Sequence, residues 1–150
     1  MPSKILLADG DASVRETLGR VLESEHYAVT PAKTGRDAAA KFFAELPDLV
    51  LLDLSMPDRD GWDVFGLMHQ THPLVPVIAI TAKTQQFKRA SECGIDALME
   101  KPLDIPLLLE TIRGYLTESE AERVRRLMRP GFKTVNLGDL ISASPQHESH

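Results

Sequence analysis

The chain has 150 residues, of which 43% are hydrophobic and 26% are charged, and its formal net charge is -5. This composition is typical of one globular domain of ordinary size, here expected to carry a short tail. The acidic balance argues against a nucleic-acid-binding surface, and the single Cys93 excludes an internal disulfide framework. No apolar stretch is long enough to span a bilayer and no signal-peptide region precedes the first strand, so we expect a cytoplasmic protein.

Short apolar runs and helical spacings alternate along the chain. Strands are predicted at residues 4–8, 27–30, 49–52, 75–80 and 95–99. A helix is predicted after each strand, at about 14–22, 36–44, 64–68, 85–92 and 108–116. Strands separated by helix-length segments cannot pair as hairpins. The pattern therefore predicts an α/β fold, a doubly wound five-stranded parallel sheet of flavodoxin-like order 2-1-3-4-5 with a C-terminal helical extension.

Polar side chains stand where four of these strands end. Asp9 follows the first strand, Asp53 follows the third, Thr81 closes the fourth and Lys101 follows the fifth. In the flavodoxin-like order the first and third strands are neighbours at the switch point of the sheet, so their carboxyl ends bring the two acids together. We expect all four groups to meet at this edge.

Asp53 is the most informative of these residues, because it ends the buried apolar run 49–52 and a carboxylate there is costly without a partner. Adjacent carboxylates are stable only when protonated, paired with a cation or bound to a metal, and Mg2+ suits an all-oxygen site. Taken singly, a strand-end Asp is usually a cap or an ion-pair partner, and a strand-end Thr reflects β propensity. Together with Lys101 and Thr81, however, the acids indicate phosphoryl transfer to aspartate.

Three segments resemble the receiver domain of two-component response regulators, and the resemblance runs from about residue 4 to residue 116. They are DLSMPDRDG at 53–61, PVIAITA at 76–82 and CGIDALMEKPL at 93–103. The resemblance implies that Asp53 is the phosphoacceptor, Thr81 the switch hydroxyl and Lys101 the phosphate-pairing lysine. It further implies Mg2+ held by Asp9, Asp53 and the Ser55 backbone carbonyl, and a cis peptide bond after Lys101.

The chain departs from the family pattern in two places inside this region. Family members usually have two consecutive acids after the first strand, but the second position here is Gly10, so the Mg2+ site is expected to be weakened. Asp11 either substitutes as a ligand or caps the first helix, where Ser13 and Glu16 also form a possible capping box. Leu98 replaces the switch aromatic of many receivers, which predicts a more graded or differently wired output.

The tail is the third departure. Residues 1–117 are expected to form the receiver domain, and 118–150 an extension without a separate effector domain. A capping box of Thr117 and Glu120 is predicted to start a short amphipathic helix, and the end of the chain from Asn136 on is expected to be disordered.

The predicted tail helix has two faces. Its apolar stripe is expected to pack on its own domain or on a twin subunit, and consists of Val124, Leu127 and Met128. Its arginines, balanced by glutamates on the same helix, are expected to form a solvated face.

The main hypothesis is a stand-alone receiver that accepts a phosphoryl group on Asp53 from a sensor histidine kinase or a phosphotransfer protein. It would signal through phosphorylation-dependent contacts with an output protein, as the phosphorylated product rather than as a conventional enzyme. A homodimer stays open, and direct contact with nucleic acid or membrane is not expected.

Two other functions were weighed. The first is a degenerate receiver that acts as a constitutive interaction module without phosphorylation, motivated by Gly10 and Leu98. The second is a phosphatase of the haloacid-dehalogenase type, which also phosphorylates an Asp after a strand. Its motif needs a second Asp where this chain has Ser55, so the pattern disfavours it.

Overall fold

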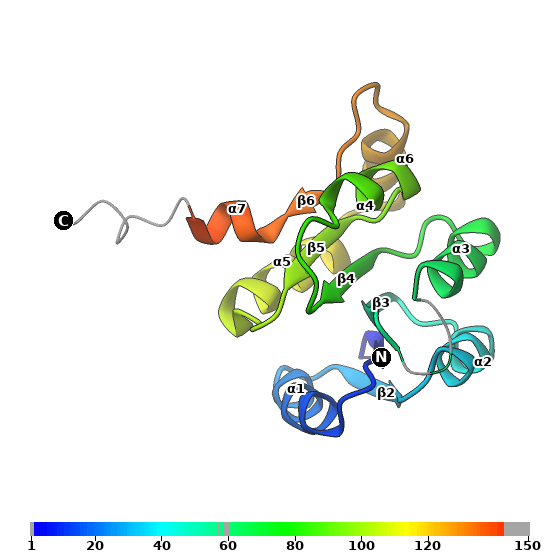
Figure 1. The fold of residues 1–150 in the computed structure, drawn as a ribbon. Coiled ribbons are helices and arrows are strands. Elements are labelled where there is room, and N and C mark those ends of the chain that lie inside the picture. Colours follow the sequence, from blue (N-terminus) through cyan, green and yellow to red (C-terminus); the bar gives the residue numbers. More distant parts are fainter. Residues whose placement is uncertain (1, 57, 59–60, 143–150) are drawn as a thin grey trace.

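The computed structural model describes residues 2–56, 58 and 61–142 (Figure 1). Strands and helices alternate through most of these residues. Their bounds are β1 (Lys4–Ala8), α1 (Ala12–Ser24), β2 (Ala28–Ala32), α2 (Gly35–Glu45), β3 (Leu49–Asp53), α3 (Gly61–Thr71), β4 (Val77–Thr81), α4 (Phe87–Cys93), β5 (Ala97–Glu100), α5 (Ile105–Thr117), α6 (Glu120–Met128), β6 (Val135–Asn136) and α7 (Leu137–Ser142).

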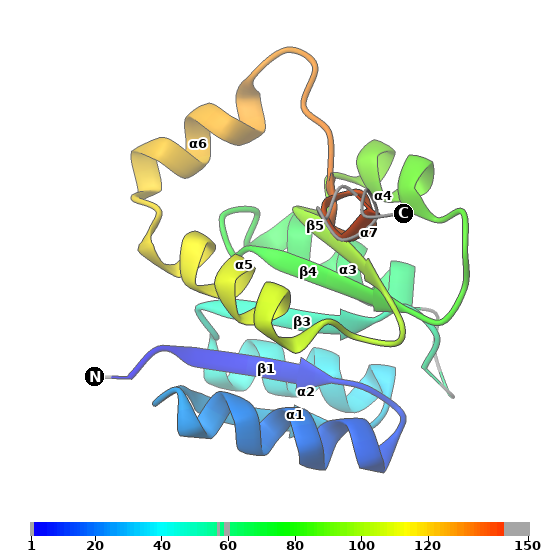
Figure 2. The same ribbon diagram turned by 90° about the vertical axis from the view of Figure 1, so that its left-hand side faces the viewer.

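The strands form one parallel sheet in the order β2-β1-β3-β4-β5-β6. The predicted order 2-1-3-4-5 is therefore confirmed, and β6 adds a sixth strand that the sequence did not predict. Helices α1 and α5 cover one face of the sheet, while α2, α3 and α4 cover the other (Figure 2). Such a three-layer arrangement buries the central strands on both sides.

β3 shows most clearly why the central strands are apolar. All five of its residues are buried. Leu49 and Leu51 pack toward α1 and α5, and Val50 and Leu52 pack toward the opposite helices. Both faces of the strand must therefore be apolar, which explains the uninterrupted run before Asp53.

Several element ends differ from the predicted ones. β2 continues through Pro31, because it is the edge strand of the sheet and an edge tolerates a residue without an N–H group. β4 starts at Val77 rather than at residue 75, since the Val75 N–H donates to the His72 carbonyl in a turn (3.2 Å) and Pro76 has no N–H to donate.

None of the helices in the described residues is long and apolar enough to span a bilayer.

The predicted capping box of Thr117 and Glu120 is wrong. α5 runs on to Thr117, whose hydroxyl donates to the Arg113 carbonyl inside that helix (3.0 Å). α6 starts after Ser119 instead. The Ser119 hydroxyl accepts from the Glu122 N–H (3.1 Å), and the Glu122 carboxylate accepts from the Ser119 N–H (3.0 Å). A capping box therefore does start α6, but it lies two residues later than predicted.

The prediction that the α6 arginines form a solvated face is also wrong for the inner pair. Arg126 donates to Asp96 (2.7 Å) and, through two nitrogens, to the Glu118 carboxylate (2.8 Å each). Arg123 donates to the Leu74 carbonyl (2.6 Å). Burial raises the pKa of Asp96, and the Val77 N–H and Arg126 oppose that rise. Arg126 thus supplies the cation that the buried Asp96 carboxylate needs.

The apolar stripe of α6 faces its own domain. Val124, Leu127 and Met128 line a hollow of about 260 Å³ together with Leu74 and Phe132. The Met128 side chain is still 77% exposed. The stripe is therefore only partly covered by the described residues.

Disorder from Asn136 on was predicted, and this is wrong for residues 136–142. The Val135 N–H donates to the Asp96 carbonyl (3.0 Å), the buried Thr134 hydroxyl donates to the Ile95 carbonyl, and Leu137 is 1% exposed in the core. Residues 143–150 lie outside the described residues. The short strand β6 thus pairs with the edge of β5 that faces away from β4, and α7 follows it (Figure 1).

Replacing Arg126 tests the ion pair between α6 and the buried Asp96. We expect Arg126→Ala to lower the free energy of unfolding by about 3 kcal/mol, because Asp96 is left buried without its cation. The matched control is Arg125→Ala on the exposed side of α6, with an expected change within about 0.5 kcal/mol. Urea unfolding of both variants measures the difference. Equal losses in the two variants would contradict the structural role of Arg126.

Candidate functional site

The four polar residues that the sequence placed at strand ends do meet at the carboxyl edge of the sheet. The Lys101 ammonium lies 2.9 Å from Asp9 Oδ2 and 3.7 Å from Asp53 Oδ2. Thr81 ends β4, next to β3. Asp9 and Thr81 are fully buried, and Asp53 is 4% exposed. One cation therefore serves two buried carboxylates.

Each of the three strand ends holds its polar side chain by a short local hydrogen bond. Asp9 Oδ1 accepts from the Asp11 N–H (2.8 Å), Asp53 Oδ1 accepts from the Ser55 N–H (2.9 Å), and Thr81 Oγ1 accepts from the Lys83 N–H (3.0 Å). These turns are the usual reason for Asp and Thr at such positions. In Asp9 and Asp53 the turn holds Oδ1, while Oδ2 of each lies within 4 Å of the Lys101 ammonium.

Lys101 is placed by its own backbone. Its N–H donates to the Thr81 carbonyl across the β4–β5 pair (2.7 Å), and the Lys101–Pro102 peptide bond is cis, as expected. The ammonium therefore reaches back over the end of the sheet toward Asp9 and Asp53.

Gly61 supports the site from the loop that follows Asp53. A Cβ atom added at Gly61 would lie 2.5 Å from the Leu54 Cα and 2.7 Å from the Asp53 carbonyl oxygen. Only glycine fits such a close approach of two backbones. The last residue of the DLSMPDRDG segment is thus needed to bring α3 against the end of β3.

The pKa values of Asp53 and Lys101 are both shifted upward, for different reasons. Burial raises the pKa of Asp53, and the neighbouring Asp9 carboxylate adds to that rise, while the Ser55 N–H and Lys101 oppose it. Partial burial works against the charged form of Lys101, but the Asp9 and Asp53 carboxylates outweigh it and raise the lysine pKa. The two carboxylates therefore favour the ammonium form of Lys101.

The donor atoms around Asp9 and Asp53 suit a small hard cation. Asp9 Oδ2 is buried and, within the described residues, receives no well-directed hydrogen bond; its charge partner is Lys101. Together with the Asp53 carboxylate and the Ser55 carbonyl it forms an all-oxygen donor set of the kind that Mg2+ prefers. Among the described residues, no group of three or more His, Cys, Asp or Glu side chains is placed to hold a metal. A weakening of the Mg2+ site by Gly10 stays a prediction.

Of the two roles that the sequence offered for Asp11, the structure shows the cap. Asp11 is exposed, and its Oδ1 accepts from the Ser13 N–H at the start of α1 (2.9 Å). Because α1 already begins at Ala12, Ser13 lies inside the first turn, and the alternative box with Glu16 does not form. A ligand role for Asp11 stays a prediction.

Leu98 is buried in the core beside Ala90 and Ile95, on the face covered by α3 and α4. In the β5–β6 pair it lies opposite Asn136. The position that many receivers fill with a switch aromatic is thus directly beside the C-terminal segment. A graded output through Leu98 stays a prediction.

Hollows flank the site on two sides. One, of about 350 Å³, is lined mainly by apolar side chains of α1 and of the segment after β5, among them Val14, Leu18 and Leu103. The other, of about 450 Å³, lies between the loops after β3 and β4 and includes Trp62 and Arg89. The Arg89 guanidinium carbon lies 4.3 Å from the centre of the Trp62 ring. No sequence pattern indicates this contact, because the two residues come from different helices.

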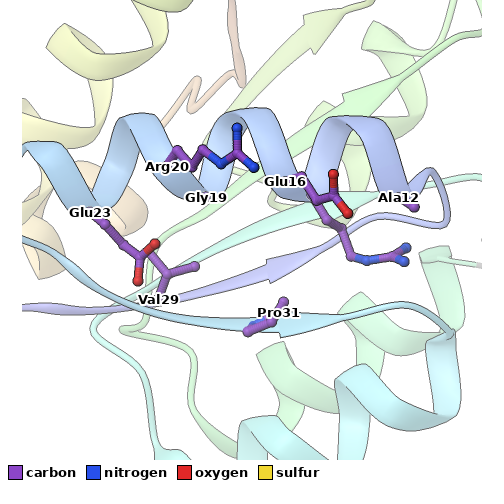
Figure 3. Close-up of a pocket in the computed structure, with 8 residues that line it drawn as sticks. Ala12, Glu16, Gly19, Arg20, Glu23, Val29 and Pro31 are labelled. Carbon is purple, nitrogen blue, oxygen red and sulfur yellow. The ribbon is translucent and has the colours of Figure 1, made fainter.

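A further hollow lies away from the site. It has a volume of about 360 Å³ and runs between α1 and β2, where Glu16, Arg20 and Glu23 line it with Gly19 and Val29 (Figure 3). None of the four strand-end residues lines it. Its mixture of opposite charges along a helix is typical of a solvated groove.

Comparisons with known proteins agree with this geometry. A family model described as the response regulator receiver domain matches residues 5–113. The response regulator MprA of Mycolicibacterium vanbaalenii is 35% identical over 118 residues, which cover 77% of this chain and 51% of the relative. The transcriptional regulatory protein TrcR of Mycobacterium tuberculosis is 29% identical over 141 residues, which cover 93% of this chain and 53% of the relative. The chain thus spans about half the length of these curated relatives.

Solved structures show the same fold. A CheY-like response regulator receiver domain protein from Methanospirillum hungatei superposes with a TM-score of 0.76 at 30% identity, covering 81% of this chain and 99% of the other. The response regulator TrrA of Thermotoga maritima, solved in complex with Mg(2+)-BeF, gives a TM-score of 0.69 at 29% identity, covering 75% of this chain and 98% of the other. The site geometry, the family match and these folds agree, and the chain belongs to the response regulator receiver domain family.

Proposed function

We propose that this receiver accepts a phosphoryl group on Asp53 from a sensor histidine kinase or a phosphotransfer protein. The observation that carries the proposal is the sharing of one ammonium group, that of Lys101, by two buried carboxylates at the end of the sheet. Such a pair is costly to bury, and its position at the switch point of the sheet is where ligands bind in this architecture.

In the proposed mechanism the Asp53 carboxylate attacks the phosphorus of the donor in line, and the donor nitrogen leaves. The Ser55 N–H holds Oδ1 and fixes the orientation of the carboxylate, while Lys101 lies on the side of Oδ2. Lys101 offsets the charge of the phosphoryl oxygens. The Thr81 hydroxyl accepts from the Lys83 N–H, so its own proton is free to be donated to a phosphoryl oxygen.

Asp9, Asp53 and the Ser55 carbonyl are the residues that we propose to hold Mg2+. When bound, Mg2+ neutralises charge on the two carboxylates and on the transferring group. The missing carboxylate at Gly10 leaves fewer ligands and weakens this site. Asp11 caps α1 and would have to leave that role to take part.

We further propose that the chain acts as a stand-alone receiver and signals through protein contacts that depend on phosphorylation. Residues 118–142 pack on the receiver through α6 and β6, so this part of the chain belongs to the receiver unit. As the phosphorylated product, the receiver is not a conventional enzyme. A cytoplasmic location and an output protein as partner stay predictions.

One observation favours a second function, that of a constitutive interaction module. Lys101 already neutralises Asp9 at 2.9 Å, and the described residues place no three-residue metal cluster at the site. A receiver in which this internal ion pair replaces the metal would keep its fold and bind a partner without phosphorylation.

Intact mass spectrometry after incubation with acetyl phosphate distinguishes the two functions. We expect one added phosphoryl group with Mg2+, none with chelator and none in Asp53→Ala. The control is Asp58→Ala, which removes an exposed acid from the same loop, one whose carboxylate accepts from the Gly35 and Arg36 N–H groups. This variant should be phosphorylated like wild type. No phosphorylation of wild type under any condition favours the interaction module.

The raised pKa of Asp53 predicts the stability of Asp53→Asn. An acid whose pKa is raised in the folded state binds its proton more tightly there, so its stabilising contribution is present at low pH and falls as pH rises from its unfolded pKa through its folded one. In chelator at pH 7, Asp53→Asn should therefore be more stable than wild type by about 1 kcal/mol, and the gain should shrink toward pH 4. Urea unfolding across pH measures both effects. A loss of stability in Asp53→Asn at pH 7 would contradict the raised pKa.

Restoring the acid tests the role of Gly10. We expect Gly10→Asp to tighten Mg2+ binding by about tenfold, because the site regains a carboxylate ligand. Isothermal titration calorimetry with MgCl2 measures the affinity, and Gly10→Asn is the neutral control of equal size. Equal Mg2+ affinity in Gly10→Asp and wild type would show that Gly10 does not limit the site.

A further inference from the structure

The hollow between the loops after β3 and β4 has a different character from the rest of the site. Its volume is about 450 Å³, and its lining includes Ser55, two residues after Asp53, and Thr81 at the end of the neighbouring strand β4. Two cationic side chains, Lys83 and Arg89, also line it, and none of the described residues that line it is acidic. We call this hollow the vestibule.

Arg89 is held in place across two helices. Its guanidinium carbon lies 4.3 Å from the centre of the Trp62 ring, and Trp62 is only 9% exposed. A guanidinium over a buried aromatic ring is attracted by the ring and loses freedom before any ligand arrives. Arg89 is therefore an exposed cation whose guanidinium is positioned by its contact with Trp62.

Lys83 is tied to the site through its backbone. Its N–H donates to Thr81 Oγ1 (3.0 Å), so its backbone is held against the switch residue Thr81. The vestibule is thus lined by two cations, Lys83 from the loop after β4 and Arg89 from α4.

The charges indicate which ligand suits the vestibule. At the end of the sheet Asp9 and Asp53 carry two negative charges, and Lys101 offsets only one of them. A phosphodonor is itself anionic and is repelled by the remaining charge. Lys83 and Arg89 place two positive charges in the vestibule, and a cationic hollow raises the local concentration of an anion.

We propose that the vestibule binds the phosphoryl end of a small anionic phosphodonor, such as an acyl phosphate, before transfer to Asp53, and that Arg89 is a positioning residue for it. This inference rests on the proposed function of Asp53. A guanidinium presents several N–H groups in one plane and matches phosphate oxygens better than an ammonium does. Arg89 contributes by holding the donor and takes no part in bond making.

The first test is the initial rate of phosphorylation by acetyl phosphate at concentrations below saturation. Arg89→Gln should lower the rate by about fivefold, and Arg89→Lys should recover part of the loss. The matched control is Lys88→Gln, which removes the same charge from an exposed neighbour on α4 that does not line the vestibule. Its rate should stay within about twofold of wild type, as expected for a distant screened charge.

The second test does not depend on phosphorylation. Trp62 is the only tryptophan of the chain and lines the vestibule, so its fluorescence reports on the contact with Arg89. Titration of wild type with inorganic phosphate should change its emission in a saturable way. The half-saturating concentration should be several-fold higher in Arg89→Gln than in wild type and unchanged in Lys88→Gln.

The outcomes separate this inference from the proposed function. If wild type is not phosphorylated but inorganic phosphate still binds in an Arg89-dependent way, the vestibule is supported and the phosphoacceptor role fails. If wild type is phosphorylated and Arg89→Gln matches Lys88→Gln in both rate and phosphate titration, the vestibule is not an anion site and the inference is overturned.

Discussion

The burial of two carboxylates beside a single ammonium group is the constraint on which the rest of the site depends. Asp9 is fully buried and Asp53 nearly so, and Lys101 is within 4 Å of both. The free energy needed to remove two carboxylates from water exceeds what their attraction to one ammonium group provides. Backbone N–H groups in the turns after β1 and β3 therefore add further stabilisation through hydrogen bonds to Asp9 and Asp53. The turn chemistry, the close approach at Gly61 and the reach of Lys101 all follow from this need.

Much of the site could be predicted from the sequence because its residues are fixed by their places at strand ends. Once strands and helices alternate, parallel topology brings the carboxyl ends together, and Asp53 needs no contact information to be placed near Asp9. The strand at 49–52 could also be predicted, because a strand buried on both faces consists of consecutive apolar residues. An edge strand such as β2 is less strictly apolar, so its sequence marks its ends less clearly. The predicted range 27–30 therefore differed from the observed strand, Ala28–Ala32.

The C-terminal extension could not be predicted in this way. Arg126 and Asp96 are 30 residues apart in sequence, and no local pattern connects them. In the sequence, the arginines and glutamates of α6 resemble ordinary surface ion pairs. Arg126 departs from that pattern because it pairs with Asp96, which is buried. β6 has two residues, too few for an alternation of apolar and polar side chains to be visible. Its place in the sheet is decided by hydrogen bonds to Ile95 and Asp96, which only the folded chain supplies.

The distances to Lys101 connect metal binding with phosphorylation. The ammonium lies nearer to Asp9, at 2.9 Å, than to Asp53, at 3.7 Å. In the proposed phosphorylated state, the group on Asp53 would carry more charge than the carboxylate it replaces and would draw Lys101 away from Asp9. Asp9 Oδ2 is buried and has no well-directed hydrogen bond from the described residues to compensate. The loss of Lys101 would then have to be offset by another cation at Asp9, and the strength of that proposed cation site would set how far phosphorylation can proceed.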